Sequence, residues 1–277
     1  MTLAMKSAAE ISILALAELF NLSFTGYIGG TIHLDRASML GMLTRDNIDL
    51  SLSHLLVRDE TLLGLILIAR QGWTSRIAGM GIIPEAQNQG LGKWFLAQVI
   101  SQARSRRERS MILEAFEQNT PAVELYKRSG FAIVRRLIGY DAPTIEGIAS
   151  PDVEGIDIYD LAKIVIQHGS PDLPWQVSGT AIARVGAPNR AYRLGHAYAL
   201  ISNPAADTIV LRALITAPEF RRQGEATCLV WALAAMFPDK KWMIVQLCPE
   251  EYDPFLLKFG FIPKALNQVQ MHLDLLI

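Results

Sequence analysis

Cysteine is almost absent from this chain of 277 residues, which contains Cys228 and Cys248 alone. Two thiols cannot build a disulfide framework or a four-thiolate metal site. The residues around both are apolar, which predicts that they are buried and structural. The five histidines are scattered without a HExxH-type pair, so we expect no metal site.

An excess of charge of either sign is also lacking. The chain has 26 Lys and Arg against 27 Asp and Glu, so its overall charge favours neither nucleic acid nor an anionic membrane. The longest apolar run, LLGLILIA, is too short to span a bilayer, and the N-terminus lacks the basic and then apolar pattern of a secretion signal. We therefore expect a cytoplasmic protein whose partners include no nucleic acid and no membrane; its oligomeric state is not indicated.

What the chain does contain is an internal repeat. The segment PEAQNQGLG at 84–92 is matched 134 residues later by PEFRRQGEA at 218–226. The segment KRSGF, which ends at Phe131, is matched 130 residues later by LKFGF, which ends at Phe261. The second copy has therefore lost four residues, most economically in the helix between the two motifs. A chain of this length with 51% hydrophobic residues can build two cores, and we predict tandem copies of one α/β fold.

The element order is clearest in the first copy. Residues 8–20 and 37–45 have helical patterns, and Ser7 and Glu10 form a capping box. Two strands then meet at Asp59 and Glu60 as a hairpin, and a third strand ends at Pro84. A helix follows from Gly90, then a strand at 111–116, a short helix from Thr120 and a last strand at 131–140. The Pro-, Gly- and acid-rich segment 141–156 predicts a linker between domains at 1–142 and 150–277.

The repeated loop has the composition of an anion site. A strand that turns through small residues into a helix exposes backbone N–H groups at the positive end of the helix dipole. Gly90 and Gly92 allow close approach of a phosphate, and Gln87 can add an amide donor. The alternative is that Gly90 merely turns or caps the chain.

The combination of motifs resembles the GCN5-related N-acetyltransferase (GNAT) family. The pattern Gln87-x-x-Gly90-x-Gly92 is followed by Asn119-x-x-Ala122-x-x-x-Tyr126 and then by Gly130-Phe131. The resemblance covers about residues 50–140 and extends to residues 1–50 through the order of elements. It implies a mixed sheet in two tandem GNAT-like acyl-CoA N-acyltransferase folds, an α/β (α+β) class of structure.

The resemblance also implies acetyl-CoA as the co-substrate. Ile82 and Ile83 would pair their backbone with the pantetheine arm, and an amide there would polarise the thioester carbonyl. Asn119 would orient the same arm, although it could instead cap a helix. Tyr126 would protonate the departing thiolate, although an aromatic residue on a short helix is often core. The pyrophosphate would be held by the backbone of Gln87, Asn88, Gln89, Gly90, Leu91, Gly92 and Lys93.

The second copy keeps the loop pattern and loses side chains for chemistry. Arg221, Gly224 and Ala226 fit the family's loop, but Glu225 places a negative charge within it. Counting along the repeat, Asn119 becomes Pro249 and Tyr126 becomes Leu256. Proline has neither a side-chain amide nor a backbone N–H, and leucine has no proton to donate. We therefore predict a catalytic first copy and a degenerate second copy with a structural role.

The predicted function is N-acetylation of an amine by direct attack on acetyl-CoA, the acceptor being a small molecule or a peptide. The alternative is a non-catalytic CoA-binding sensor or scaffold. A nucleotide-binding protein is less favoured, because Lys93-Trp94 follows the glycines instead of a Lys-Ser/Thr pair.

The sequence does not determine the general base or the nature of the cleft for the amine. The general base is unidentified, and its candidates are Glu114, Glu117, His33 and Asp35. Apolar residues between 20 and 45 predict either an apolar cleft or ordinary core packing: Phe20, Phe24, Tyr27, Met39 and Met42.

Overall fold

The computed structural model describes residues 3–276 and divides them into two compact units. The first unit contains residues 3–135 together with 268–276, and the second is Arg136–Asn267. Each contains its own run of paired strands, flanking helices and apolar interior.

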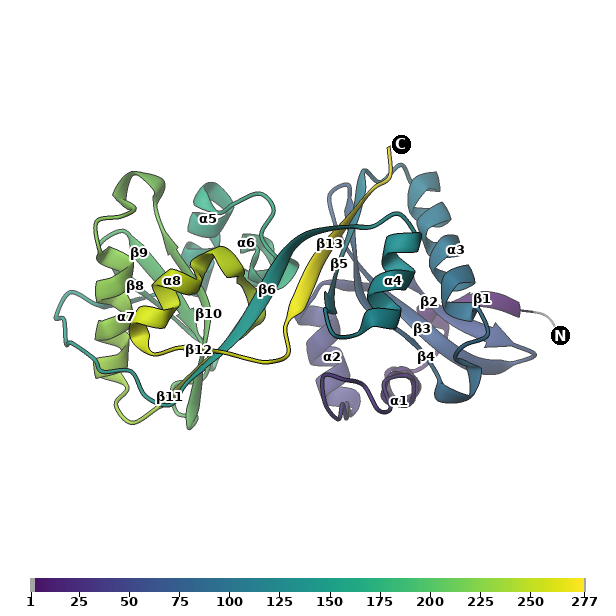
Figure 1. Ribbon diagram of the computed structural model, residues 1–277, viewed down its shortest axis with the longest axis horizontal. Helices are drawn as coiled ribbons and strands as arrows, with labels where there is room; N and C mark the ends of the chain where they lie inside the picture. Colours follow the sequence, from purple (N-terminus) through teal and green to yellow (C-terminus); the bar gives the residue numbers. More distant parts are fainter. Residues whose placement is uncertain (1–2, 277) are drawn as a thin grey trace. The chain divides into compact units, whose positions relative to one another are not determined.

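Six strands form the sheet of the first unit, in the order β1, β2, β3, β4, β5, β13 (Figure 1). Neighbours are antiparallel except β4 and β5, which are parallel. Asp59 and Glu60 turn the β2–β3 hairpin with positive φ values of 45° and 70°, as the sequence predicted. The strands are Leu3–Ser7, Ile48–Arg58, Thr61–Gln71, Thr74–Ile82, Ser110–Phe116 and Gln268–Asp274.

Four helices complete this unit: α1 (Ile13–Ser23), α2 (Arg36–Arg45), α3 (Leu91–Ser105) and α4 (Thr120–Arg128). The predicted capping box forms, but it starts a single 3-10 turn over Ala8–Glu10. Helix α1 begins later, where the Ser12 hydroxyl accepts a hydrogen bond from the Ala15 N–H. Strand β1 was not predicted.

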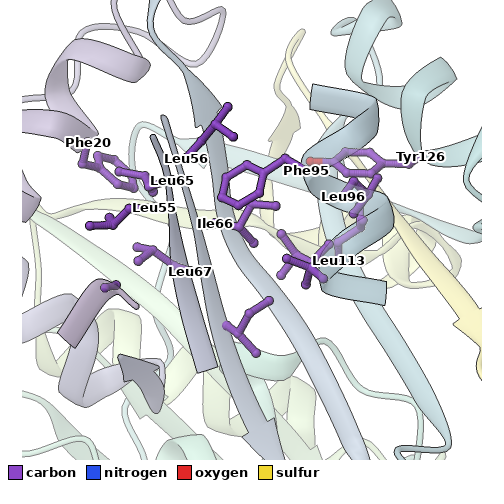
Figure 2. Close-up of a cluster of buried hydrophobic side chains, with 14 of the residues drawn as sticks. Phe20, Leu55, Leu56, Leu65, Ile66, Leu67, Phe95, Leu96, Leu113 and Tyr126 are labelled. Carbon is purple, nitrogen blue, oxygen red and sulfur yellow. The ribbon is translucent and has the colours of Figure 1, made fainter. Parts of the chain in front are cut away.

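Helices α1 and α3 cover opposite faces of this sheet. A Cβ atom on Gly79 of β4 would lie 3.3 Å from the Phe20 ring of α1, whereas one on Gly92 of α3 would lie 3.6 Å from Met80. Successive side chains of a strand point to opposite faces, so Gly79 and Met80 face different helices. Side chains from α1, β2, β3, α3 and α4 fill the interior on both sides (Figure 2).

The second unit repeats the first sheet strand by strand. Its order is β7, β8, β9, β10, β11, β6, and again one pair alone, β10 with β11, is parallel. A short strand β12 (Ile262–Pro263) also pairs with β6. The six strands in this order are Glu154–Ile156, Arg190–Leu194, Ala197–Ile201, Thr208–Thr216, Lys241–Pro249 and Ala132–Ala142.

The helices of the second unit account for the lost residues. Helix α7 (Glu225–Met236) has 12 residues against 15 in its counterpart α3, so three of the four missing residues come from the predicted place. The remaining helices are α5 (Ile158–His168), α6 (Gly179–Ile182) and α8 (Asp253–Leu256). Within residues 3–276, no helix is long and apolar enough to cross a lipid bilayer. Short 3-10 turns lie at Pro84–Ala86, Trp175–Val177, Pro218–Phe220, Glu250–Tyr252 and Leu257–Phe259.

The two copies exchange their last strands. Strand β6 ends the first copy in sequence but pairs with β11 of the second unit, and β13 ends the second copy but pairs with β5 of the first (Figure 1). Each strand adds buried side chains to the core that it joins, Tyr140 in one case and Met271 in the other. The structural units therefore differ from the ranges 1–142 and 150–277 expected from the sequence.

The segment 141–156 is not a free linker. Strand β6 continues to Ala142 and β7 begins at Glu154. Between them, a Cβ on Gly147 would lie 2.1 Å from the Ala235 backbone nitrogen, and the Ile148 N–H donates to the Trp231 carbonyl. The segment thus packs on α7, because its glycine allows backbone to approach backbone.

Candidate functional site

The parallel strands of the first unit separate along their length. Strands β4 and β5 pair from Thr74 with Ser110 to Ile77 with Leu113, and their pairing ends there. Strand β4 continues to Ile82 and β5 to Phe116. The C-terminal half of β4 is therefore unpaired on this side, and an extended ligand can align with it.

A β-bulge marks the point where the strands separate. On β3, Leu67 pairs with Gly79 and Ile68 with Ile77, so Ala78 has no partner there. Such an extra residue bends a strand and increases its twist. The second unit has a bulge 134 residues later, at Arg212 in β10.

Few backbone groups remain free in the opening. The Ile83 N–H donates to the Leu63 carbonyl at 2.9 Å and its carbonyl accepts from the Ala86 N–H at 3.0 Å. Because bonding direction alternates along an antiparallel pair, the N–H and C=O groups of Met80 and Ile82 point away from β3. The Ile82 carbonyl already accepts from Gln87 Nε2 at 2.9 Å. Of the predicted pair Ile82 and Ile83, the Ile82 N–H is therefore the donor that faces the opening. The backbone of Met80 also faces it, which the sequence did not indicate.

The loop at the end of β4 presents backbone donors. Asn88 and Gly90 have positive φ values of 59° and 76°, and α3 starts at Leu91 without a side-chain cap. The N–H groups at positions Leu91, Gly92 and Lys93 precede the first intrahelical bond, which Trp94 makes to the Gly90 carbonyl. An anion at this helix start would meet these donors and the positive end of the dipole.

The loop's own side chains fasten it in place. Gln87 is bonded to the end of β4, and Gln89 Nε2 donates to the Glu85 carbonyl at 3.0 Å while its Oε1 accepts from Arg58 at 3.2 Å. Leu91 is buried and Lys93 is exposed. No carboxylate lies between Gln87 and Lys93, so nothing in this segment repels a phosphate.

Asn119 stands at the start of α4 with its side chain unused. It occupies the N-cap position, yet its amide makes no capping bond, and Pro121 follows within the first turn. The helix-capping alternative is therefore wrong. The half-buried amide keeps its donors and acceptor for a ligand.

Tyr126 belongs to the core and still has a free hydroxyl. Its side chain is 7% exposed and lies in the buried cluster with Phe95 and Leu96 (Figure 2). The centre of its ring lies 5.8 Å from that of Phe131. Burial, and to a smaller extent the nearby Tyr27, raise its pKa well above the usual value of 10.0. Its hydroxyl has no hydrogen-bond partner among residues 3–276. At neutral pH Tyr126 is thus a proton donor and not a base.

The four candidate bases are held in different ways, and Glu114 alone of them has a buried carboxylate oxygen, Oε1, without a hydrogen-bond partner in the described chain. Glu114 Oε2 is held by Arg76 Nε at 2.7 Å in a buried ion pair. Asp35 caps α2, where hydrogen bonds from Ser38 lower its pKa, and His33 is exposed. Glu117 Oε1 lies 3.4 Å from the Gln118 amide.

The histidines and cysteines are possible metal ligands, and the cysteines were predicted to be buried thiols. Within residues 3–276, no three His, Cys, Asp or Glu side chains gather as a metal site would require. Cys228 is exposed on α7, so the prediction that it is buried is wrong. Cys248 is half-buried, and burial together with Glu251 raises its pKa to about 12.

The second unit keeps the loop geometry. Arg222 and Gly224 have positive φ values of 65° and 89°. Arg221 Nε donates to the Thr216 carbonyl at 3.0 Å, and Gln223 Nε2 donates to the Glu219 carbonyl at 3.1 Å. These two bonds correspond to those of Gln87 and Gln89, so the frame of the loop is preserved.

What differs in the second unit is the chemistry around that frame. Glu225 stands in the first turn of α7, and its carboxylate accepts from the His196 N–H at 2.8 Å. Leu256, buried in α8, takes the place of Tyr126 in the repeat, and Pro249, the last residue of β11, takes that of Asn119. The second copy therefore has neither the free hydroxyl nor the free amide.

A comparison with protein families agrees with this geometry. Residues 15–131 match the model of the family described as "Acetyltransferase (GNAT) family". Residues 15–131 belong to the GNAT family. Members of this family are acyl-CoA N-acyltransferases that act on small-molecule or protein amines. No curated protein sequence matches the chain significantly.

Solved structures extend the likeness to the whole chain. A tandem GNAT protein from the clavulanic acid biosynthesis pathway matches with a TM-score of 0.65 and 13% identity, covering 99% of both chains. A GNAT from Sphaerobacter thermophilus matches with a TM-score of 0.66 and 12% identity, covering 99% of this chain and 96% of its own. One from Anabaena variabilis matches with a TM-score of 0.68 and 14% identity, covering 99% of this chain and 73% of its own. At these identities the likeness establishes the fold, a tandem pair of GNAT folds.

Proposed function

We propose that this protein transfers the acetyl group of acetyl-CoA to an amine, and that the first unit carries the chemistry. The main support is one difference between two copies that share a loop geometry. The first copy has an unpartnered hydroxyl on Tyr126, and the second has Leu256 at the matching place. A duplicated frame with the proton donor in one copy favours catalysis in that copy.

The first unit fits the co-substrate at three points. The loop Gln87–Lys93 offers backbone N–H groups for a pyrophosphate and contains no carboxylate. The open edge of β4 offers backbone groups of Met80 and Ile82 for an extended amide-bearing arm. The free amide of Asn119 is a further partner for that arm.

Each residue of the site has a separate role in the acyl transfer. Acetyl-CoA supplies a thioester, whose carbonyl carbon forms a C–N bond with the amine while its C–S bond breaks and a thiolate departs. The Ile82 N–H donates to the carbonyl oxygen as negative charge develops there. Tyr126 donates its proton to the departing sulfur, and the amine gives up one proton, so the hydroxyl is restored. Because Arg76 stabilises Glu114 as a carboxylate and makes it a weak base, the amine enters in its neutral form.

Paired glycine variants test the assignment of the loop. Gly90 and Gly224 occupy equivalent left-handed positions with nothing within 4 Å of an added Cβ, so a side chain strains the backbone equally at both. We expect Gly90→Val to abolish acetyl-CoA binding in calorimetry and Gly224→Val to leave it unchanged. Equal affinity in the two variants would overturn the assignment.

Release of free thiol from acetyl-CoA with a panel of amines tests the reaction itself. We expect amine-dependent release by the whole protein and its loss in Gly90→Val. Binding of acetyl-CoA without release for any amine would instead support a CoA-binding sensor or scaffold.

A further inference from the structure

Aromatic side chains form a continuous row on the α1 side of the opening in the first unit. Phe24, at the end of α1, meets Tyr27 edge to face with ring centres 5.2 Å apart. Tyr27 in turn meets Phe116, the last residue of β5, at 5.7 Å. We call Phe24, Tyr27 and Phe116 the aromatic wall.

The wall spans the two strands that separate. A Cβ on Gly81 of β4 would lie 3.1 Å from the Phe24 ring, so one end of the wall rests on β4 beside Ile82. The other end is part of β5. The wall therefore borders the place where the carbonyl of the acyl group would be polarised.

The wall differs from the core residues near it. Phe20 and Met39, which the sequence could not separate from the wall, are buried in the core. Phe24 and Tyr27 are half-buried and keep part of their rings for a ligand. Phe20 and Met39 are thus core residues, whereas Phe24, which packs against the same core, and Tyr27 both keep exposed ring surface.

Gly29 fixes the position of the wall. A Cβ there would lie 2.5 Å from the Phe116 ring and 2.9 Å from that of Tyr27. The loop that carries Tyr27 can approach β5 this closely because Gly29 has no side chain. A rigidly held ring loses less entropy on binding than a mobile one.

The Tyr27 and Tyr126 hydroxyls belong to segments far apart in the sequence, and the first acts on the pKa of the second. Tyr27 follows α1 and Tyr126 lies on α4, yet the first contributes to the raised pKa of the second. Neither hydroxyl has a hydrogen-bond partner within residues 3–276. The wall is therefore close to the proton donor of the proposed reaction.

The charges around the wall do not suit a polycation. Glu114 is neutralised by Arg76, Asp35 is engaged at the start of α2, and Glu117 has the Gln118 amide beside it. Glu114 Oε1 has no hydrogen-bond partner, but the charge of this carboxylate is balanced by Arg76, so a second ammonium group in the acceptor would meet no net negative charge at this ion pair. An apolar group would instead gain from contact with the exposed ring surfaces.

We infer that the acceptor is a monoamine whose nitrogen is joined through a short linker to an aromatic or branched aliphatic group, and that Tyr27 and Phe24 select this group. The inference rests on the proposed function, since the wall is placed relative to the acyl-transfer site. It names the substrate class of that site.

Kinetics with matched amines test the selection. We expect 2-phenylethylamine to exceed 1,4-diaminobutane in kcat/KM by about 10- to 200-fold, the range that modest differences in apolar contact produce. Tyr27→Ala and Phe24→Ala should reduce the ratio of the two kcat/KM values towards one and leave the KM for acetyl-CoA unchanged. Tyr27→Phe keeps the ring and should keep the preference. The neighbouring Ile28→Ala is the control, because Ile28 is exposed and outside the wall.

Binding measurements separate failure of the inference from failure of the proposed function. Calorimetry of 2-phenylethylamine with the acetyl-CoA-saturated protein should give a weaker affinity for Tyr27→Ala than for Tyr27→Phe. If this difference appears without thiol release, the wall is supported and the acetyltransferase proposal fails. A preference for the diamine, or a Tyr27→Ala variant with the wild-type preference and affinity, overturns the inference.

Discussion

At the scale of the residue, the site depends on polar groups that the fold leaves without partners. The Tyr126 hydroxyl and the Asn119 amide make no hydrogen bond within the described chain, although Tyr126 is almost fully buried. A buried hydroxyl without a partner costs about 1–3 kcal/mol. Such a cost is consistent with a group that is kept for a ligand.

Replacing Tyr126 by Phe separates the two roles of this residue. The ring remains in the core and an unpartnered hydroxyl is removed, so we expect unchanged acetyl-CoA affinity and a free energy of unfolding up to about 1–3 kcal/mol above that of wild type. Turnover should fall about 100- to 10,000-fold, because a general acid is lost. Steady-state kinetics, calorimetry and denaturant unfolding measure the three quantities.

Tyr140→Phe is the matched control for this experiment. The Tyr140 hydroxyl donates to Asp253 in the second unit, so its loss should cost about 1 kcal/mol of stability and leave turnover unchanged. Wild-type turnover in Tyr126→Phe, measured where chemistry limits the rate, would remove Tyr126 from the mechanism.

At the scale of the element, the repeated loop was predictable and the shape of β4 was not. Gly90 and Gly224 mark a strand-to-helix turn by their spacing alone, and both adopt the left-handed conformation. The bulge at Ala78 has no comparable signal, because it arises from the pairing of β3 with β4. The sequence therefore predicted the anion loop and missed the free backbone of Met80.

The glycines of β4 should determine how closely α1 approaches. A Cβ on Gly81 would lie 2.8 Å from the Ser23 Cβ and 3.2 Å from the Ser23 carbonyl oxygen, both near the end of α1. We expect Gly81→Ala to push α1 away from β4 and to lower the free energy of unfolding by about 1–3 kcal/mol. Phe24 should move with α1 and raise the KM of the amine.

Gly41→Ala is the matched control, because the same substitution should raise the free energy of unfolding there. Gly41 lies in α2 with nothing within 4 Å of an added Cβ, so alanine should stabilise the helix by about 0.5–1 kcal/mol. Denaturant unfolding measures both variants. Equal stability of Gly81→Ala and Gly41→Ala would show that the α1–β4 contact is not tight.

At the scale of the whole molecule, the sequence predicted two copies but not the exchange of their last strands. The pattern of β6 identified a strand, and its neighbours along the chain suggested that it pairs within the first copy. Which sheet a terminal strand joins depends on side chains distant in sequence, such as those of β11 around Trp242. Hydrophobic periodicity reports which face is buried and says nothing of the partner strand.

The exchange makes a sharp prediction about fragments. Strand β13 and the residue after it contribute four buried side chains to the first core: Val269, Met271, Leu273 and Leu275. Fully burying such side chains contributes roughly 1.5–3 kcal/mol each, or about 6–12 kcal/mol together, as an upper estimate. A whole domain is stable by only about 5–15 kcal/mol.

We therefore expect residues 1–142, expressed alone, to be insoluble or inactive, because β5 loses its partner β13 and exposes that edge. Fusing residues 268–277 to residues 1–135 through a flexible Gly/Ser linker should restore a folded monomer that binds acetyl-CoA, since it supplies β13 without the second unit. Gel filtration, thermal unfolding and calorimetry compare the two fragments.

The same fusion with Met271→Asp is the control and should fail to fold, because Met271 is fully buried. A soluble, monomeric and fully active 1–142 fragment would mean that β13 is dispensable, and the exchange would then add nothing essential to the first unit.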